Sequence, residues 1–196
     1  VDDHDLFDRE VTWRLALSRQ LTASDTRVRG SFATGFKAPT ANQLFVTSVT
    51  SFGPFTGNPN LQPEESRGWE LGLDRSFAAG NTQAGATYYE NRIKNLITFN
   101  NTFTSNENRD RVDIRGIELY LQSTLSEKLT ARADAAFIRS VDQATDQNLL
   151  RRPLRKASAS LDYAPAAGTV LTAETVYTGP RYDIDAVSIA RIRRGG

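Results

Sequence analysis

The sequence of 196 residues contains no Cys and no Met, and its 24 basic and 23 acidic side chains leave a formal net charge of +1. The lack of cysteine excludes disulfide frameworks, thiolate metal sites and thiol catalysis, and the interspersed charges provide no basic field for nucleic acid. No segment reaches the roughly 18 apolar residues of a membrane-spanning helix. The negative mean hydropathy resembles that of water-soluble proteins, but transmembrane β-barrels share it because apolar and polar side chains alternate along their strands.

Alternation with a period of two recurs along the chain. Within residues 11–21 the odd positions are mostly large and apolar, including Val11, Trp13 and Leu21, whereas the even positions are mostly polar. Each segment with this pattern is predicted to be a strand with one apolar and one polar face. The segments that show it clearly are 11–21, 27–32, 69–74, 129–137, 156–163 and 169–177.

Two further strands, over residues 82–93 and 111–124, alternate less regularly. In the second, Val112 and Ile114 occupy one phase, whereas Ile117, Leu119 and Leu121 occupy the other. Gly116 lies at the switch between the two phases. Because a glycine inside a strand often marks an irregular pairing, a β-bulge is predicted near Gly116.

The connections between these strands alternate in length. The breaks after the first, third, fifth and seventh strands are short and cover residues 22–25, 78–81, 123–128 and 164–168. The other three are long and cover residues 37–65, 96–110 and 140–155. Short turns on one rim and long loops on the other are typical of outer-membrane β-barrels, with the turns in the periplasm and the loops outside. The sequence therefore predicts an all-β fold of about eight antiparallel transmembrane strands.

The charges support this interpretation, because mid-strand charges keep mostly to the polar phase. On the lipid face a Lys or Arg costs roughly 2–4 kcal/mol at the midplane of the bilayer. The exceptions Arg19, Arg75 and Arg139 lie near strand ends, where a long side chain reaches water.

A soluble β-sandwich or lipocalin-like barrel also alternates, but seldom has loops of such unequal length. Side chains that fit aromatic girdles at the membrane interfaces are Trp13, Trp69, Tyr88 and Tyr177.

Several motifs carry a resemblance to a known family. Residues 35–45 (GFKAPTANQLF), 57–66 (GNPNLQPEES) and 69–72 (WELG) are similar to the barrel signature of TonB-dependent receptors. The matching branch includes the cobalamin receptor and several iron-siderophore receptors. Pro39, Pro59 and Pro63 lack backbone donors, so this region must leave the sheet as a shaped loop. Shorter matches follow in the same order: Tyr88 with Tyr89, then 93–97 (IKNLI), 115–118 (RGIE), 150–153 (LRRP) and 177–182 (YTGPRY).

The resemblance implies an outer-membrane location in a Gram-negative bacterium and a barrel of about 22 strands preceded by a plug domain. We expect residues 1–196 to form a partial barrel domain that lacks the plug and the final strands. Two open sheet edges are intolerable in lipid, so we expect further strands or other chains to pair with them. The implied partners are the plug, the TonB energy-coupling complex, outer-membrane lipid and lipopolysaccharide, and a cobalamin or iron-siderophore cargo.

Charged residues in the polar phase are predicted to face the barrel lumen, where they would contact the plug or water. These lumen-facing candidates are Arg27, Arg29, Glu70, Asp74, Glu118, Arg132 and Asp134, with Lys156 and Asp162 in the same phase. A basic group near the outer rim, formed by Arg151, Arg152, Arg155 and Lys156, is a second candidate surface, either for lipopolysaccharide phosphates or simply for water.

Cargo contacts are expected from aromatic side chains in the long loops, because such side chains offer a large apolar area at low entropic cost. The alternative is that they pack loop against loop. The candidates are Phe45, Phe52, Phe55 and Phe103. Catalysis is not expected, since His4 is the only histidine and no phosphate loop, nucleophile elbow or metal cluster appears. No cofactor and no nucleic acid partner are expected either.

The sequence thus predicts a non-enzymatic segment of a TonB-dependent receptor that imports a scarce nutrient. Cobalamin is the first choice of cargo and an iron-siderophore complex is the second. A small eight-stranded structural barrel or adhesin is an alternative, and it requires the first and last strands to pair. A soluble β-barrel that binds carbohydrate or lipid is a further alternative.

Overall fold

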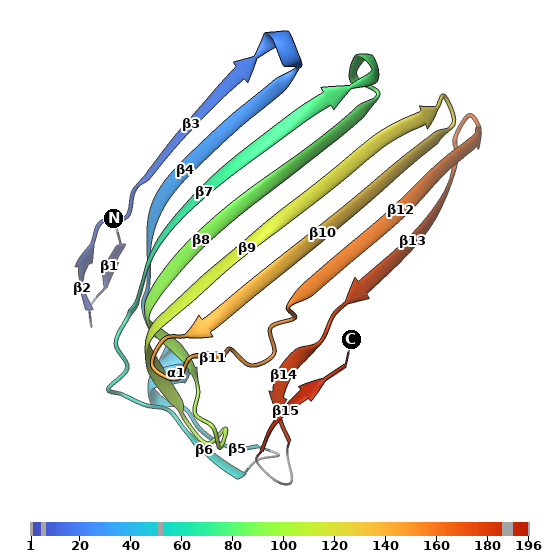
Figure 1. Ribbon diagram of the computed structural model, residues 1–196. Helices are drawn as coiled ribbons and strands as arrows, with labels where there is room; N and C mark the ends of the chain where they lie inside the picture. The colour runs from blue at the N-terminus through green and yellow to red at the C-terminus, as the bar shows by residue number, and fades with distance from the viewer. Residues whose placement is uncertain (1, 5–6, 51–52, 186–189, 196) are drawn as a thin grey trace.

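The computed structural model describes residues 2–4, 7–50, 53–185 and 190–195. One large antiparallel sheet dominates it, in the strand order β13-β12-β10-β9-β8-β7-β4-β3, with β11 paired to β10 (Figure 1). Three two-stranded sheets accompany it. In chain order the elements are β1 (Asp2–His4), β2 (Phe7–Glu10), β3 (Arg14–Leu21), η1 (Thr22–Ser24), β4 (Thr26–Lys37), α1 (Ala41–Phe45), β5 (Thr47–Thr50), β6 (Gly53–Thr56), β7 (Glu64–Phe77), η2 (Ala78–Gly80), β8 (Thr82–Phe99), β9 (Asn106–Ser126), β10 (Leu129–Asp142), β11 (Gln147–Asn148), β12 (Arg155–Ala166), β13 (Thr169–Thr178), β14 (Arg181–Ile184) and β15 (Arg191–Arg194).

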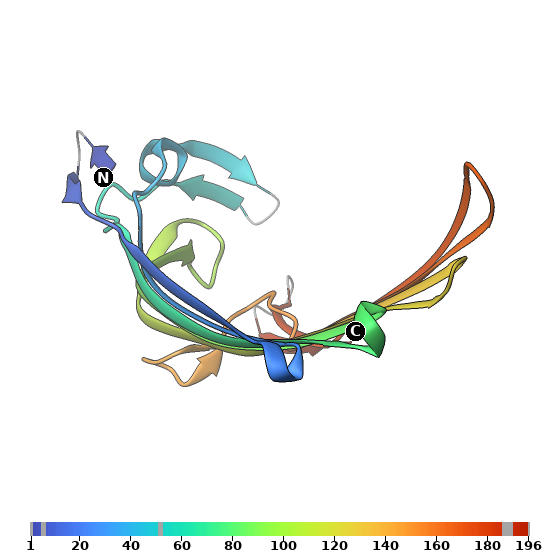
Figure 2. The same cartoon turned by 90° about the horizontal axis from the view of Figure 1, so that it is seen from above.

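The eight-strand prediction is confirmed, because the eight strands from β3 to β13 on the main path coincide with the predicted segments. Neighbours along the chain pair with each other, and the sheet curves into an open arc (Figure 2). Among the described residues β3 and β13 are the two edges of the arc and do not pair. The arc is therefore a section of a wall and not the closed eight-stranded barrel considered as an alternative.

The alternation of short and long connections is also confirmed, with all short turns on one rim and all long loops on the other (Figure 1). The extent predicted for the loop over residues 96–110 is wrong. The ladder between β8 and β9 continues to Phe99 and Asn106, which leaves only residues 100–105 as a loop. The reason is that beyond the lipid both faces of a strand meet water or loops, so the apolar alternation disappears while the pairing persists.

The β-bulge predicted at Gly116 is wrong. Gly116 pairs with Tyr89 on one side and Ile138 on the other without a register shift. A Cβ at Gly116 would lie 2.6 Å from the Tyr89 hydroxyl and 2.8 Å from the Phe137 carbonyl, so the glycine accommodates a close approach. The apolar phase switches because Val112 is buried on the concave face, whereas Ile117 lies on the convex face.

The convex face carries an apolar band that a water-soluble protein would bury. Leu71 and Leu119 are 58% and 42% exposed on this face. Trp69 and Phe77 lie eight residues apart on β7, which corresponds to ~26 Å at about 3.3 Å per residue. This height matches the apolar band of about 25 Å in outer-membrane barrels. Within the described residues, no helix has the length and apolar character to cross a membrane.

Two ring contacts mark the loop-side limit of this band. Trp13 stacks on Phe32 with centroids 5.2 Å apart, and Trp69 contacts Tyr88 at 5.3 Å. All four rings belong to the outward phase, as expected for a girdle at the membrane interface. Tyr177, also outward and 51% exposed, occupies the corresponding end of β13.

The loops form a separate layer over the concave face at their rim, where α1, β5 and β6 lie inside the curve of the sheet (Figure 2). This layer contains the conventional core of the described chain. Leu44, Leu61 and Ile97 pack together with exposures of 4%, 1% and 8%. The short helix α1 starts with a capping box, in which the Thr40 hydroxyl accepts from the backbone N–H of Gln43 while the Gln43 side chain accepts from that of Thr40.

Candidate functional site

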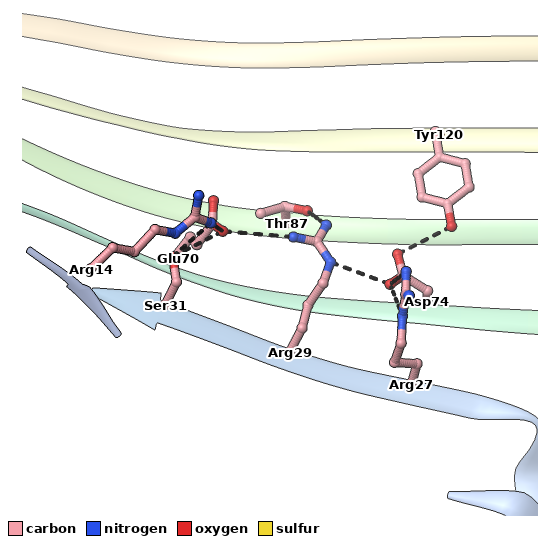
Figure 3. A network of polar contacts seen from close by, with 8 residues as sticks. All are labelled: Arg14, Arg27, Arg29, Ser31, Glu70, Asp74, Thr87 and Tyr120. Atoms are coloured by element: carbon pink, nitrogen blue, oxygen red, sulfur yellow. Dashed lines mark hydrogen bonds and ion pairs between the residues drawn. The ribbon is translucent and has the colours of Figure 1, made fainter. Parts of the chain in front are cut away.

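Polar side chains from five neighbouring strands form a network on the concave face (Figure 3). Its centre is Asp74 on β7, whose side chain is 12% exposed. One carboxylate oxygen of Asp74 accepts from Arg27 Nη2 at 2.9 Å and from Arg29 Nε at 3.2 Å. The other accepts from the Tyr120 hydroxyl at 3.1 Å. Arg29 also donates to the Thr87 hydroxyl on β8, so one carboxylate ties four strands together.

Glu70 forms the second half of this network. It accepts from the Ser31 hydroxyl at 3.0 Å and from Arg14 Nη2 at 3.4 Å. The Nη1 atom of Arg29 lies 4.0 Å from the same Glu70 oxygen. Arg29 therefore bridges two carboxylates, and a row of fixed, partly exposed charges runs across the concave wall (Figure 3).

The structure brings together four of the seven predicted lumen-facing residues, namely Arg27, Arg29, Glu70 and Asp74. The other three share the concave phase but lie outside the network. Arg132 pairs with Asp162 on β12, while Glu118 and Asp134 form no ion pair within the described residues. Neither group has the arrangement of a catalytic site, and among the described side chains no cluster of three potential ligands could hold a metal ion.

Sequence reasoning missed Arg14, Ser31, Thr87 and Tyr120 as network members. Thr87 and Tyr120 lie in the two strands with irregular alternation, so their phase was ambiguous. Arg29 pairs across the strands with Gly72, and Gly72 pairs with Thr87. In the same way Asp74 pairs with Gly85, and Gly85 pairs with Tyr120. The signal that could have found them is this cross-strand register, which requires the turns to be placed correctly.

The motif at residues 57–66 fastens the loop layer to the wall. Gly57 packs against the backbone of α1, since a Cβ there would lie 2.6 Å from the carbonyl carbon of Leu44. Asn58 donates from its amide to the Asn106 carbonyl at 3.1 Å and accepts from the Asn60 N–H at 3.0 Å. These contacts favour an architectural role for the motif.

Glu64 completes the fastening at the base of the loop. Its Oε1 atom accepts from the backbone N–H of Ile97 at 3.1 Å and from Lys37 Nζ at 2.9 Å. Its side chain is only 13% exposed. The contact therefore joins β7 to both of its neighbours, β4 and β8, at the point where the chain re-enters the sheet.

The four loop aromatics named as cargo candidates lie in different surroundings. Phe45 is 63% exposed at the end of α1, and Phe52 lies outside the described residues. Phe55 and Phe103 are buried at 7% and 9% exposure, and their ring centroids lie 5.9 and 6.1 Å from that of Phe99. Two candidates thus pack loop against loop, and Phe45 is the described one that is open to a ligand.

A groove beside α1 lies between the first long loop and β8. Its volume is about 560 Å³, and it joins Asn42 and Gln43 of α1 to Thr50, Phe55 and Phe99. The walls combine amide and hydroxyl groups with aromatic rings. Such a surface suits a large ligand with both apolar and hydrogen-bonding groups.

The basic group at residues 151–156 has its own acidic partner. Asp183 on β14 accepts from Arg151 Nε at 3.1 Å and from the Ile184 N–H at 2.9 Å, and Arg194 lies 3.5 Å away. Partial burial raises the pKa of Asp183, but these two hydrogen bonds and the charges of Arg151 and Arg194 outweigh it. The pKa of Asp183 is therefore lowered.

Comparison with known proteins agrees with this architecture. Residues 1–194 match the family model described as TonB dependent receptor-like, beta-barrel. The chain is 31% identical over 199 residues to the Vitamin B12 transporter BtuB of Photobacterium profundum, covering 98% of this chain and 31% of that protein. The chain thus spans about a third of the length of this curated relative.

Solved structures share the fold. The ferric enterobactin receptor PfeA of Pseudomonas aeruginosa superposes with a TM-score of 0.75 at 22% identity, over 96% of this chain and 30% of that one. The copper transporter OprC gives a TM-score of 0.68 at 18% identity, over 85% of this chain and 26% of that one. The curved wall, the unequal rims and the match over nearly the whole chain lead to one conclusion: the chain belongs to the TonB-dependent receptor β-barrel family, whose members are transport receptors of the Gram-negative outer membrane.

Proposed function

We propose that the chain forms wall strands and extracellular loops of a receptor that imports cobalamin across the outer membrane. The observation that carries this proposal is the 31% identity with a vitamin B12 transporter over 98% of the chain. In the proposed cycle, cargo binds to the loops and the TonB complex rearranges a plug domain. Cargo then crosses the lumen.

The concave network supports the lumenal part of this proposal. Arg29 and Asp74 hold each other in fixed positions, on a face whose ion pairs extend from Arg14 on β3 to Asp162 on β12. Fixed charges of both signs can form specific contacts with a folded domain inside the barrel, and they are less costly there than on the lipid face. A plug domain is the partner that this wall fits.

The groove beside α1 and the exposed Phe45 ring support the cargo-binding part. A corrinoid combines a broad apolar ring system with peripheral amide groups. The aromatic rings of Phe55 and Phe99 together with the amides of Asn42 and Gln43 match that combination. A ferric siderophore is the second cargo class considered, and the binding experiment separates the two.

The test is equilibrium binding to the full-length receptor that contains this segment, with cyanocobalamin and a ferric catecholate siderophore as probes. The proposal predicts saturable binding of cyanocobalamin and at least a hundredfold weaker binding of the siderophore. The reverse preference would assign the receptor to iron uptake, and saturable binding of neither would overturn both assignments.

Phe45→Ala tests the loop contact. Since Phe45 is 63% exposed, its removal leaves the loop core intact and should weaken cyanocobalamin binding about tenfold. Phe77→Ala is the matched control, because Phe77 is a 41% exposed aromatic at the opposite rim of β7 and is expected to leave binding unchanged. Equal affinity for both variants would remove Phe45 from the cargo site.

A further inference from the structure

A second pocket at the loop rim is lined by arginines from three different parts of the chain. Its volume is about 370 Å³, and it contains Arg109 of β9, Arg152 of the connection between β11 and β12, and Arg191 of β15. We call it the arginine pocket, and the elements β11, β14 and β15 lie together around it (Figure 1). Asp142 is the one carboxylate among its described lining residues, so three arginines against one aspartate leave an excess of two positive charges.

Arg109 and Asp142 neutralise each other. Arg109 Nη1 lies 3.2 Å from Asp142 Oδ2, and the Asp142 side chain is only 6% exposed. The other oxygen of Asp142 accepts from the backbone N–H of Ala144 at 2.9 Å, while Arg109 Nη2 lies 2.7 Å from Glu107 Oε1. Both groups therefore have their partners within the protein, and the positive excess of the arginine pocket belongs to Arg152 and Arg191.

Arg152 and Arg191 are exposed, and neither has a carboxylate partner within the described part of the chain. The guanidinium of Arg191 is nevertheless held in place. It donates from Nη1 to Gln147 Oε1 at 3.0 Å and from Nη2 to the Asn148 carbonyl. Its Cζ atom also lies 4.6 Å above the centre of the Tyr182 ring. The pocket thus presents a positioned positive charge that neutral groups hold, and such a charge remains available to an anion.

Asn148 gives the arginine pocket a free hydrogen-bond acceptor. Its side-chain oxygen is buried and accepts no hydrogen bond from the described part of the chain. A buried polar atom without a partner is uncommon in proteins, because its desolvation is not compensated. Since Asn148 lines the pocket, an N–H group of a ligand can supply the missing donor. The lining therefore suits a ligand that carries an anionic group close to an amide.

The arginine pocket adjoins the groove beside α1. Ile97, Thr98 and Phe99 of β8 line both, so a single strand separates them. In cobalamin the negative charge lies on a phosphodiester in a side chain that extends from the amide-bearing corrin ring to the nucleotide. A ring in the groove beside α1 can therefore place this phosphodiester in the arginine pocket.

We infer that the arginine pocket binds the phosphodiester of a cobalamin whose ring occupies the groove beside α1. Arg152 and Arg191 donate charge-assisted hydrogen bonds to the phosphate oxygens, for which planar guanidinium groups are well suited. Asn148 Oδ1 accepts from an amide of the same ligand. The inference rests on the proposed function and adds a specificity to it, because a corrinoid without the phosphodiester leaves the two cations unpaired.

The test compares equilibrium binding of cyanocobalamin and dicyanocobinamide to the full-length receptor. Dicyanocobinamide keeps the corrin ring and its amides but lacks the phosphodiester and the nucleotide. The parent should bind cyanocobalamin at least tenfold more tightly, and the double variant R152Q/R191Q should abolish this difference by weakening cyanocobalamin binding alone. Equal binding of the two corrinoids by the parent overturns the inference and leaves the proposed function intact, whereas binding of neither overturns both.

Arg152→Gln alone keeps the test independent of the folding of the double variant, because the Arg152 side chain is exposed and has no ion-pair partner among the described residues. It should weaken cyanocobalamin binding about threefold and leave dicyanocobinamide binding unchanged. Arg155→Gln is the matched control, since Arg155 is also exposed but pairs with the outward Phe137 and does not line the pocket. An equal loss in the control, or an equal loss for both corrinoids in Arg152→Gln, overturns the inference.

Discussion

The wall and the loop layer of this chain differ in which side chains they bury: the wall exposes its apolar side chains, and the loop layer buries them. In the wall, Leu71 and Leu119 point outward and Asp74 points inward, because lipid lies outside and water or a plug lies inside. In the loop layer, Leu44 and Leu61 are buried while polar groups face outward, as in a water-soluble protein. The wall is therefore suited to surrounding lipid and the loop layer to surrounding water. The girdle residues Trp69 and Tyr88 lie at the boundary between the two. Substitutions in the full-length receptor test this difference.

The largest effect is expected from a cavity in the loop layer. Leu61→Ala removes a side chain that is 1% exposed and should destabilise this layer by about 2–5 kcal/mol. Hydrogen exchange of the α1 amides measures the effect. The folding of the barrel itself should not change, as measured by the difference in gel-electrophoretic mobility between unheated and heated samples. Val49→Ala, at 86% exposure, is the control and should stay within about 0.5 kcal/mol. Equal effects of the two substitutions would show that the layer has no packed core.

A charge on the lipid face should rank next. Leu121→Arg lies on the convex face of β9, midway between Ile117 and Leu125, and should cost roughly 2–4 kcal/mol of folding free energy in bilayers. Gln122→Arg, the adjacent residue on the concave face, should cost less than about 1 kcal/mol even though Gln122 pairs with Arg132. Reversible unfolding in lipid vesicles measures both. If Gln122→Arg cost more folding free energy than Leu121→Arg, the convex face would be the lumen face and the concave face the lipid face.

The concave network provides a smaller effect. Asp74→Asn removes the charge that two arginines and a tyrosine share, and should cost roughly 1–3 kcal/mol. Asp134→Asn changes a concave carboxylate outside the network and should stay within about 0.5 kcal/mol. Chemical denaturation of the two variants compares them directly, and equal costs would mean that the network does not stabilise the wall.

The smallest effect is an acid dependence confined to the loop rim. Because the pKa of Asp183 is lowered, its contribution to stability is present above the ordinary Asp range. It is lost as the pH falls through the lower value in the folded state, below about pH 4. The Ile184 amide should then exchange faster in the parent, whereas Asp183→Asn should show no such transition. Comparing the two proteins at each pH removes the intrinsic pH dependence of exchange.

Much of the wall was predictable because side chains along a barrel strand point alternately to lipid and to the lumen, so apolar and polar residues alternate in the sequence. The segments 129–137 and 156–163 became β10 and β12, and both expose their apolar phase as expected. The predictions that were wrong, at Gly116 and over residues 96–110, lie where the strands leave the lipid. Beyond the lipid both faces of a strand meet water or loops, so the alternation of apolar and polar residues no longer indicates which face a residue occupies.

The loop layer was much less predictable. Pro39, Pro59 and Pro63 indicated departure from the sheet, but not the helix α1 or the contact of Gly57 with its backbone. Phe55 and Phe103 were named as cargo candidates, yet both pack against Phe99. The contact of Phe55 with Phe99 joins residues 44 positions apart in the sequence, and no local pattern encodes it.

The sequence by itself determined the fold class, the eight strands of the wall, the polar face and the family resemblance, because each depends on local alternation, turn length or short motifs. The tertiary structure decided which charges meet. Arg29 and Asp74 are separated by 45 residues and form a bridge, whereas Arg67 and Arg92 face each other as like charges on the opposite surface. Those pairings follow from register, and register is a property of the assembled sheet rather than of any one strand.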